Sequence, residues 1–400
     1  MYENLAILAA FVFVYSTVAG GVERTPFSGP IVFSLFGLIL GPIGFGILTL
    51  EVNHDGLKIL AELTLALVLF TDAASTRMKA LEHDYEIPLR LLFVGLPLTI
   101  LFGFLVGIFV FDELGMFQVA ILATMLAPTD AALGKAVVSN KAVPEKIRDS
   151  LNVESGLNDG LCVPVLFILL ALVSISKAEG GTLELVIITV SREIGYGLLV
   201  GLGLTFIANK VLKVSAKEGW LNNVWLQIPV GALAVACFAL AEFLGGSGFI
   251  AAFTGGILFG SLNKQNKHKF TRSAEGTGDT LALLTWVIFG AMVVGQSFSY
   301  FDWHILLYAI LSLTLIRMLP VILSLSGTGL SMKSKLFIGW FGPRGLASIV
   351  FGVIVLNEAL PGGKMLSMAV VYTVVLSIVL HGLSANPLSA KFVSRKSSEL

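Results

Sequence analysis

Four polar residues follow one another along a helix predicted in the apolar run 147–174. They are Glu154, Ser155, Asn158 and Asp159. Spacings of three and four residues place Glu154 over Asn158 and Ser155 over Asp159, so all four side chains share one face of the helix. Carboxylate, amide and hydroxyl oxygens suit hard monovalent cations and show no preference for transition metals. The alternative is a polar interface between helices without an ion, although two carboxylates exceed what such an interface needs.

The predicted helix 116–139 contains a proline that is followed by Thr129 and Asp130. Pro128 removes one backbone hydrogen bond and disfavours helical geometry at the residue before it, which frees carbonyl and amide groups at membrane depth. Irregular backbone is tolerated there only in a protein-lined or wet cavity. A harmless kink would explain Pro128 alone. Asp130 favours a site, because an ionisable side chain in hydrocarbon costs about 2.5 to 3.5 kcal/mol and usually marks an ion or proton pathway.

A second interruption is predicted in the run 335–357, where Gly342, Pro343, Arg344 and Gly345 follow one another. Here a cation rather than an anion lies at the break. The two interrupted helices are fifth and twelfth among the predicted spans, which are corresponding positions in two halves of six helices. This pattern predicts inverted repeats whose broken helices cross at a binding site.

The composition places these helices in a membrane. The chain has 400 residues, of which 56% are hydrophobic and 13% charged, with a mean hydropathy of +0.90. A soluble domain carries about twice that charged fraction. We therefore expect an all-α polytopic membrane protein, and the net charge of zero gives no indication of nucleic-acid binding. About thirteen spans are predicted, near 4–21, 27–49, 57–75, 89–111, 116–139, 147–174, 183–211, 222–243, 246–262, 279–298, 303–325, 335–357 and 364–386.

The placement of lysine and arginine predicts the orientation of these spans. With the N-terminus outside, the inner connections hold 19 basic residues and the outer ones hold only Lys58, Lys177 and Lys364. Because cytoplasmic loops carry the basic excess, we expect the N-terminus outside and the C-terminus in the cytoplasm. The first apolar run has no basic residues before it and no small-residue cleavage site, so we expect it to be retained as a span. The tail 389–400 is expected to be too short for a folded regulatory module.

Four basic residues fall inside predicted spans, namely Lys135, Arg192, Arg317 and Arg344. Arg192 lies near a helix end, where it can extend to the interface or pair with Glu193. Arg317 is flanked by apolar residues and needs a buried anion. Lys135 follows Asp130 by five residues, and it either extends toward the cytoplasmic end or tunes the site.

A few further residues have simpler interpretations. Cys162 and Cys237 fall inside apolar runs, which indicates inert buried thiols rather than a disulfide or a metal site. His381 is expected to be buried as a packed neutral imidazole rather than to act as a pH sensor. Asp72 lies near the inner end of its span, where it could line a funnel or lie at the membrane interface.

The motifs APTD (127–130) and ESGLNDG (154–160), together with GPRG (342–345), resemble those of the monovalent cation:proton antiporters of the NhaP/NHE type. The resemblance covers essentially the whole chain. It implies an NhaA-like fold in a homodimer, in the cell membrane of a bacterium or archaeon. The implied parts are a dimerisation domain (1–75 and 222–298), a linker helix (183–211) and an ion-transporting core (89–174 and 303–388).

The resemblance also implies the residues that bind the transported ions. Asp159 would be the essential carboxylate, which takes either a proton or a cation. Asp130, Ser155 and the backbone of Thr129 would complete the cation shell.

The same resemblance also implies roles for four further residues. Asn158 replaces the first aspartate of the Asp-Asp pair of electrogenic relatives, which favours electroneutral exchange. Glu154 would pair with Arg317. Arg344 would offset the carbonyl dipoles at the helix ends and brace Asn158.

The expected function is therefore antiport of a monovalent cation against H⁺ by alternating access, with both ions competing for Asp159. Na⁺ is the expected cation and Li⁺ or K⁺ are alternatives, so a K⁺/H⁺ antiporter of the same fold stays open. No enzymatic activity, cofactor or nucleotide is expected. An ion channel would need a selectivity ring that the sequence does not supply. An intramembrane aspartyl protease would need a GxGD motif, which is missing, and a non-transporting sensor of the same fold is a further alternative.

Overall fold

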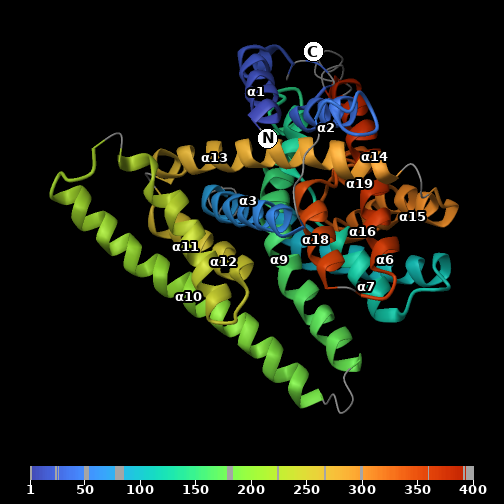
Figure 1. Ribbon diagram of the computed structural model, residues 1–400. Helices are drawn as coiled ribbons and strands as arrows, with labels where there is room; N and C mark the ends of the chain where they lie inside the picture. Colours follow the sequence, from blue (N-terminus) through green and yellow to red (C-terminus); the bar gives the residue numbers. More distant parts are fainter. Residues whose placement is uncertain are drawn as a thin grey trace. The chain divides into compact units, whose positions relative to one another are not determined.

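Figure 1 shows the computed structural model of the chain. It describes residues 2–22, 25, 27–48, 54–76, 85–177, 183–222, 225–264, 267–297, 301–358, 360–390 and 392. Every regular element in these ranges is helical, as the sequence predicts. Eight described helices are long and apolar enough to cross a membrane: Tyr2–Val22, Glu86–Val110, Glu145–Ser174, Glu184–Lys217, Trp225–Phe243, Phe270–Val294, Trp303–Ser324 and Gly363–Ala390. Shorter apolar helices add to them, so the chain is a multi-pass membrane protein.

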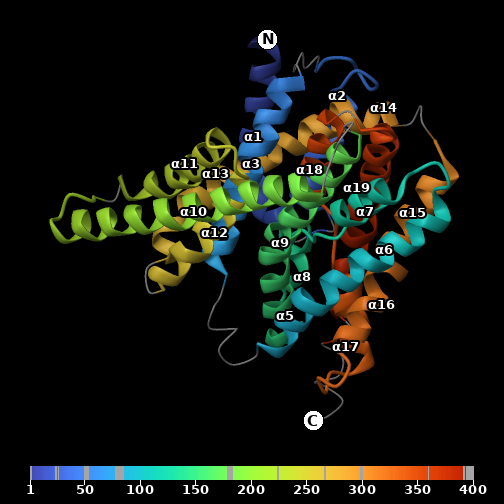
Figure 2. The same ribbon diagram turned by 90° about the horizontal axis from the view of Figure 1, so that it is seen from below.

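The chain forms two compact units. Unit 1 comprises Met1–Lys58, His83–Ser155 and Leu283–Leu400, and unit 2 comprises Ile59–Glu82 and Gly156–Ala282. Three helices contribute residues to both units: α3 (His54–Ser75), α9 (Glu145–Lys177) and α13 (Lys267–Ile288). In unit 2, the long helix α10 (Leu183–Lys217) packs along α11 (Pro229–Phe243) and α12 (Gly248–Leu262), as Figures 1 and 2 show.

Unit 1 contains the two helices that the sequence predicts to be interrupted. Its elements are α1 (Tyr2–Val22), α2 (Gly29–Leu40), α5 (Glu86–Arg90), the π-helix η1 (Leu91–Gly95), α6 (Leu96–Val110), α7 (Met116–Met125), α8 (Ala131–Val138), η3 (Phe289–Val294), α14 (Gly295–Ser297), α15 (Trp303–Leu313), α16 (Leu315–Ser324), α17 (Met332–Trp340), α18 (Leu346–Asn357) and α19 (Gly363–Ala390). Helix α19 packs against α15, α18 and α8, and α6 packs against α7 and α16 (Figure 2).

Some helix boundaries differ from the prediction because hydropathy does not detect backbone breaks. The second predicted span was expected to continue to residue 49, but α2 ends at Leu40. Gly41 leaves the helix with an extended backbone, and Pro42 cannot continue it. The chain then turns back, and the amide of Phe45 donates to the carbonyl of Ile39 at 2.7 Å.

Other boundaries were wrong for different reasons. Helix α13 begins at Lys267, well before the predicted 279. The prediction missed its first turns because they are polar and only the later part of the helix is apolar. The predicted span 303–325 is two helices that meet at Thr314, whose φ and ψ of −111° and −94° are not helical. The predicted span 246–262 is confirmed as α12, which begins at Gly248 after its N-cap Ser247.

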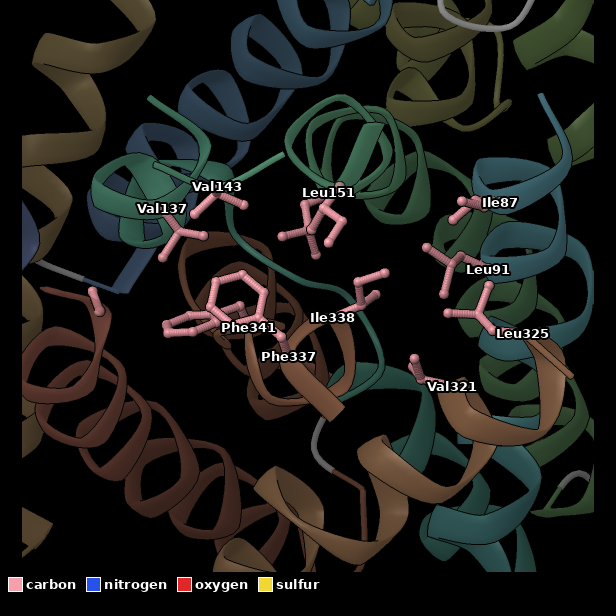
Figure 3. Packing of buried hydrophobic residues seen from close by; sticks show 12 residues of the cluster. Ile87, Leu91, Val137, Val143, Leu151, Val321, Leu325, Phe337, Ile338 and Phe341 are labelled. Carbon is pink, nitrogen blue, oxygen red and sulfur yellow. The ribbon is translucent and has the colours of Figure 1, made fainter. Parts of the chain in front are cut away.

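A buried apolar cluster in unit 1 supports the two short half-helices α8 and α17 (Figure 3). In this view Leu151 of α9 lies between the valines of the α8 region and the residues of α5 and η1. The cluster comprises Ile87, Leu91, Val137, Val143, Ile147, Leu151, Val321, Leu325, Phe337, Ile338, Phe341 and Ala385. A helix of about two turns is marginal by itself, so its packing on such a core fixes its position.

Candidate functional site

The first predicted interruption is present in unit 1. Helix α7 ends at Met125 and α8 begins at Ala131, which leaves 126–130 outside any helix. Asp130 caps the new helix, because its Oδ1 accepts hydrogen bonds from the amides of Ala132 at 2.7 Å and Leu133 at 3.1 Å. An acidic side chain is favourable at this end of a helix, where free amides carry a partial positive charge.

The second interruption is also present, and it meets the first. Helix α17 ends at Trp340 and α18 begins at Leu346. The amide of Asp130 donates to the carbonyl of Pro343 at 2.7 Å, and the amide of Leu346 donates to Oδ2 of Asp130 at 2.9 Å. One carboxylate therefore accepts from the first turns of both α8 and α18.

Gly345 allows this close approach. A Cβ atom built on Gly345 would lie 1.9 Å from Oδ2 of Asp130, which is far inside contact distance. Gly342 plays the same part for Arg317, because an added Cβ would lie 2.5 Å from Nε of that guanidinium group. The two glycines of the GPRG motif thus leave room for an acidic and a basic side chain respectively.

Arg344 lies at the C-terminal end of α7, where free carbonyl groups carry a partial negative charge. Its guanidinium is fully buried, and Nη1 donates to the carbonyl of Ala127 and, at 3.0 Å, to that of Pro128. The hydroxyl of Ser348 donates to the carbonyl of Met125 at 2.8 Å. Carbonyl groups at the end of a helix lack partners within the helix, so Ser348 satisfies the end of α7, and Arg344 satisfies the backbone of the break that follows it.

Helix α9 brings two more predicted residues into unit 1. Glu154 and Arg317 lie with Oε1 and Nη1 2.6 Å apart, and each side chain is only 1% exposed. The two groups therefore form a buried ion pair. The hydroxyl of Ser155 donates to the carbonyl of Thr129 at 2.5 Å, which ties α9 to the first break.

Asn158 and Asp159 follow on α9 and belong to unit 2. Their side chains are 1% and 9% exposed, as buried as those of Glu154 and Ser155 before them. In the same unit, Asp72 of α3 lies against this helix, because a Cβ atom added to Gly156 would come 3.8 Å from its Cβ. Asp72 itself is half-buried.

A small open pocket borders the two breaks in unit 1. It is lined by Thr129, Asp130, Gly134, Val137, Val138, Leu151, Ser155, Phe341 and Pro343. Three residues predicted as cation ligands, Thr129, Asp130 and Ser155, therefore line one pocket. Carboxylate, hydroxyl and carbonyl oxygens at such a position can bind a hard cation.

Other predictions have mixed outcomes. Cys162 and Cys237 are buried thiols, as expected. The side chain of Lys135 lies outside the described residues, so its role stays a prediction. Sequence reasoning missed the contacts of Ser348 and Ser377 with the breaks, since an isolated serine in an apolar run gives no distinguishing signal.

Interrupted helices that meet beside buried charged groups are typical of secondary membrane transporters. The chain belongs to the sodium/hydrogen exchanger transmembrane family, whose model matches residues 7–391.

Two curated relatives illustrate the range of this similarity. The K⁺/H⁺ antiporter NhaP2 of Shewanella sp. (strain ANA-3) is 23% identical over 380 residues, which cover 95% of this chain and 64% of that protein. A Na⁺/H⁺ antiporter of Schizosaccharomyces pombe is 25% identical over 253 residues, which cover 60% of this chain and 54% of that protein. The chain thus spans less than two thirds of the length of these relatives.

A solved structure supports the fold. The sodium proton antiporter MjNhaP1 from Methanocaldococcus jannaschii at pH 8 matches with a TM-score of 0.74 and 22% identity, over 98% of this chain and 99% of that one. The two chains therefore share their fold.

Proposed function

We propose that this protein is a secondary active antiporter that exchanges a monovalent cation for H⁺ across the membrane. The observation that carries the proposal is the junction of two broken helices at Asp130, beside a pocket that oxygen ligands line. The family to which the chain belongs supports it, as do relatives that are named for Na⁺/H⁺ and K⁺/H⁺ exchange.

In the proposed mechanism, Asp159 holds either a proton or a cation but not both. Competition for this carboxylate couples the two fluxes without any nucleotide or cofactor. Asn158 beside it is neutral, so only one of these two neighbouring residues on α9 can carry charge. This favours electroneutral exchange of one cation for one proton. The roles of Asp130, Ser155 and Thr129 as further cation ligands stay predictions.

We further propose the membrane arrangement that the sequence predicts. The N-terminus faces outward and the C-terminus lies in the cytoplasm, because the basic residues gather in the inner connections. By resemblance, the protein forms a homodimer through 1–75 and 222–298. The parts 89–174 and 303–388 would then carry the ions, and the helix at 183–211 would link the two domains.

Replacement of Asp159 tests the function directly. The protein is reconstituted into liposomes that hold a pH-sensitive dye, and an imposed cation gradient drives proton movement. We expect Asp159→Asn and Asp159→Ala to abolish cation-dependent proton flux, because neither side chain can exchange a proton for a cation. Asp112→Asn is the matched control, since Asp112 is exposed and lies outside the site. Near-normal flux in the Asp159 variants would refute the proposal.

The same assay ranks the cations. Na⁺, Li⁺ and K⁺ are titrated separately, and we expect Na⁺ to give half-maximal flux at the lowest concentration. Recording of single-channel currents tests the channel alternative, because an electroneutral exchanger passes no net current.

A further inference from the structure

His381 is a buried imidazole of α19 that the proposed mechanism does not use. Its side chain is 2% exposed. Nε2 lies 2.8 Å from the carbonyl oxygen of Trp340, the residue at which α17 ends. The ring also packs near the side chains of Trp340 and Phe341, with ring centroids 5.2 Å and 6.3 Å away. His381 therefore contacts the start of the second interruption.

The other ring nitrogen leads to the end of the same interruption. Nδ1 lies 3.1 Å from the hydroxyl oxygen of Ser377, one turn earlier on α19. That hydroxyl oxygen accepts the backbone amide of Arg344 at 2.7 Å. The indole Nε1 of Trp340 donates to the hydroxyl of Ser384 at 2.8 Å. On one face of α19, His381 and Ser377 thus contact the backbone on the two sides of Pro343, and Ser384 contacts the indole of Trp340.

The donors and acceptors assign a tautomer to His381. A carbonyl oxygen only accepts, so Nε2 carries a proton. The hydroxyl of Ser377 already accepts from Arg344, and its own hydrogen can be donated to Nδ1. The doubly protonated ring would instead donate to the carbonyl of Ser377, 2.9 Å from Nδ1. That form would add a positive charge to a buried region of unit 1 that already holds Arg344 and in which the carboxylate of Glu154 is paired with Arg317, so we assign the neutral form.

The contact of His381 has a counterpart at the first interruption. There Ser348 donates to the carbonyl of Met125 at the end of α7, and Arg344 donates to that of Ala127 in the break. At the second interruption, Nε2 of His381 donates to the carbonyl at the end of α17. In both broken helices, a carbonyl at the end of the first half therefore accepts a hydrogen bond from a side chain of another helix.

We propose that His381 is a positioning residue for ion exchange, which acts as a neutral donor to the Trp340 carbonyl. It holds 341–345 in the shape that presents the Pro343 carbonyl and the Leu346 amide to Asp130. The inference rests on the proposed function. It predicts that loss of the donor disturbs cation binding, while helix α19 itself remains intact.

A matched pair of variants isolates the Nε2 donor. His381→Gln places an amide nitrogen at the same number of bonds from Cα as Nε2, so it can still donate to Trp340. His381→Asn places its amide at the distance of Nδ1 and cannot reach that carbonyl. We measure dye-reported exchange in proteoliposomes against cation concentration, with wild-type protein and Asp159→Asn in parallel and size-exclusion profiles as the check of folding.

We expect the cation concentration for half-maximal exchange to rise about tenfold in His381→Asn and to change less than about threefold in His381→Gln. A contact that matters only for stability would lower the amount of active protein and the maximal rate, and leave the half-maximal concentration unchanged. Equal behaviour of the Asn and Gln variants, or an unchanged half-maximal concentration in both, would overturn the proposal. Absence of cation-dependent flux in the wild type would instead refute the proposed function.

Two further readouts test the neutral form. Because glutamine does not titrate, His381→Gln should keep the wild-type pH profile of exchange, and a shifted profile would show that protonation of the ring takes part. In ¹⁵N-histidine-labelled wild-type protein, NMR should show one signal of the neutral Nε2-protonated tautomer that disappears in His381→Gln. A doubly protonated ring at neutral pH would overturn the assignment, and this measurement does not depend on transport.

Discussion

The ion pair between Glu154 and Arg317 allows a quantitative test. Both side chains are 1% exposed, and the charged atoms are 2.6 Å apart. With an effective dielectric constant of about 20, two unit charges at this distance attract by about 6 kcal/mol, and most of that gain offsets the cost of removing both from water. Removal of one partner leaves the other charge buried and uncompensated. We expect Glu154→Leu or Arg317→Met to lower the free energy of unfolding by about 3 to 5 kcal/mol.

The double variant distinguishes a coupled pair from two independent contacts. Glu154→Leu combined with Arg317→Met leaves no buried charge at this position, so it should cost much less than the sum of the single variants. The assay is equilibrium unfolding in mixed detergent micelles with increasing SDS, followed by circular dichroism. The interaction energy from the double-mutant cycle should be at least about 2 kcal/mol.

A second pair in the chain provides the control. Arg90 and Glu86 lie 3.0 Å apart on α5, but their side chains are 37% and 52% exposed. Water screens such a pair, so the same cycle with Glu86→Leu and Arg90→Met should give an interaction energy below about 1 kcal/mol. If the costs at Glu154 and Arg317 were simply additive, the reasoning about the buried pair would be refuted.

Two further predictions concern Gly345 and Asp302. In Gly345→Ala the new Cβ would lie 1.9 Å from Oδ2 of Asp130, so the carboxylate must move by about 1 Å and exchange in proteoliposomes should fall about 100-fold. Gly203→Ala, where nothing lies within 4 Å, is its control, and equal rates in the two variants would contradict the prediction. At the start of α15, burial raises the pKa of Asp302, but hydrogen bonds from the amides of His304 and Ile305 and from the His304 ring outweigh it and hold the pKa below its usual value. The carboxylate therefore stabilises the fold above the unfolded-state pKa of about 4, and this stabilisation is lost as the pH falls through the lower folded-state pKa. The unfolding temperature of the wild type should exceed that of Asp302→Asn at neutral pH and converge with it in acid, and a gap that is constant with pH would contradict this.

The sequence predicts the breaks well because single residues cause them. Pro128 and the Gly342–Gly345 run have local backbone effects that do not depend on the rest of the fold, and helices end at Met125 and Trp340 as a result. The need of Arg317 for a buried anion is likewise a local inference, since a guanidinium group in an apolar run has few alternatives.

Features that depend on distant contacts could not be predicted from the sequence. The amide of Leu346 and the carboxylate of Asp130 are 216 residues apart in the chain, and only the folded structure brings them together. The contact of His381 with Trp340 spans 41 residues and has no sequence motif. The non-helical backbone at Thr314 also lies between two leucines, with no adjacent proline or glycine to predict it.

The hydrogen bonds of Asp130 limit how many ligand positions it can offer. A carboxylate has about four lone-pair directions, two on each oxygen. The amides of Ala132 and Leu133 occupy both on Oδ1, and the amide of Leu346 occupies one on Oδ2. A metal ion in the neighbouring pocket could therefore share a single electron pair of this group, on Oδ2, and bidentate coordination would require α8 to give up one of its two hydrogen bonds to Oδ1.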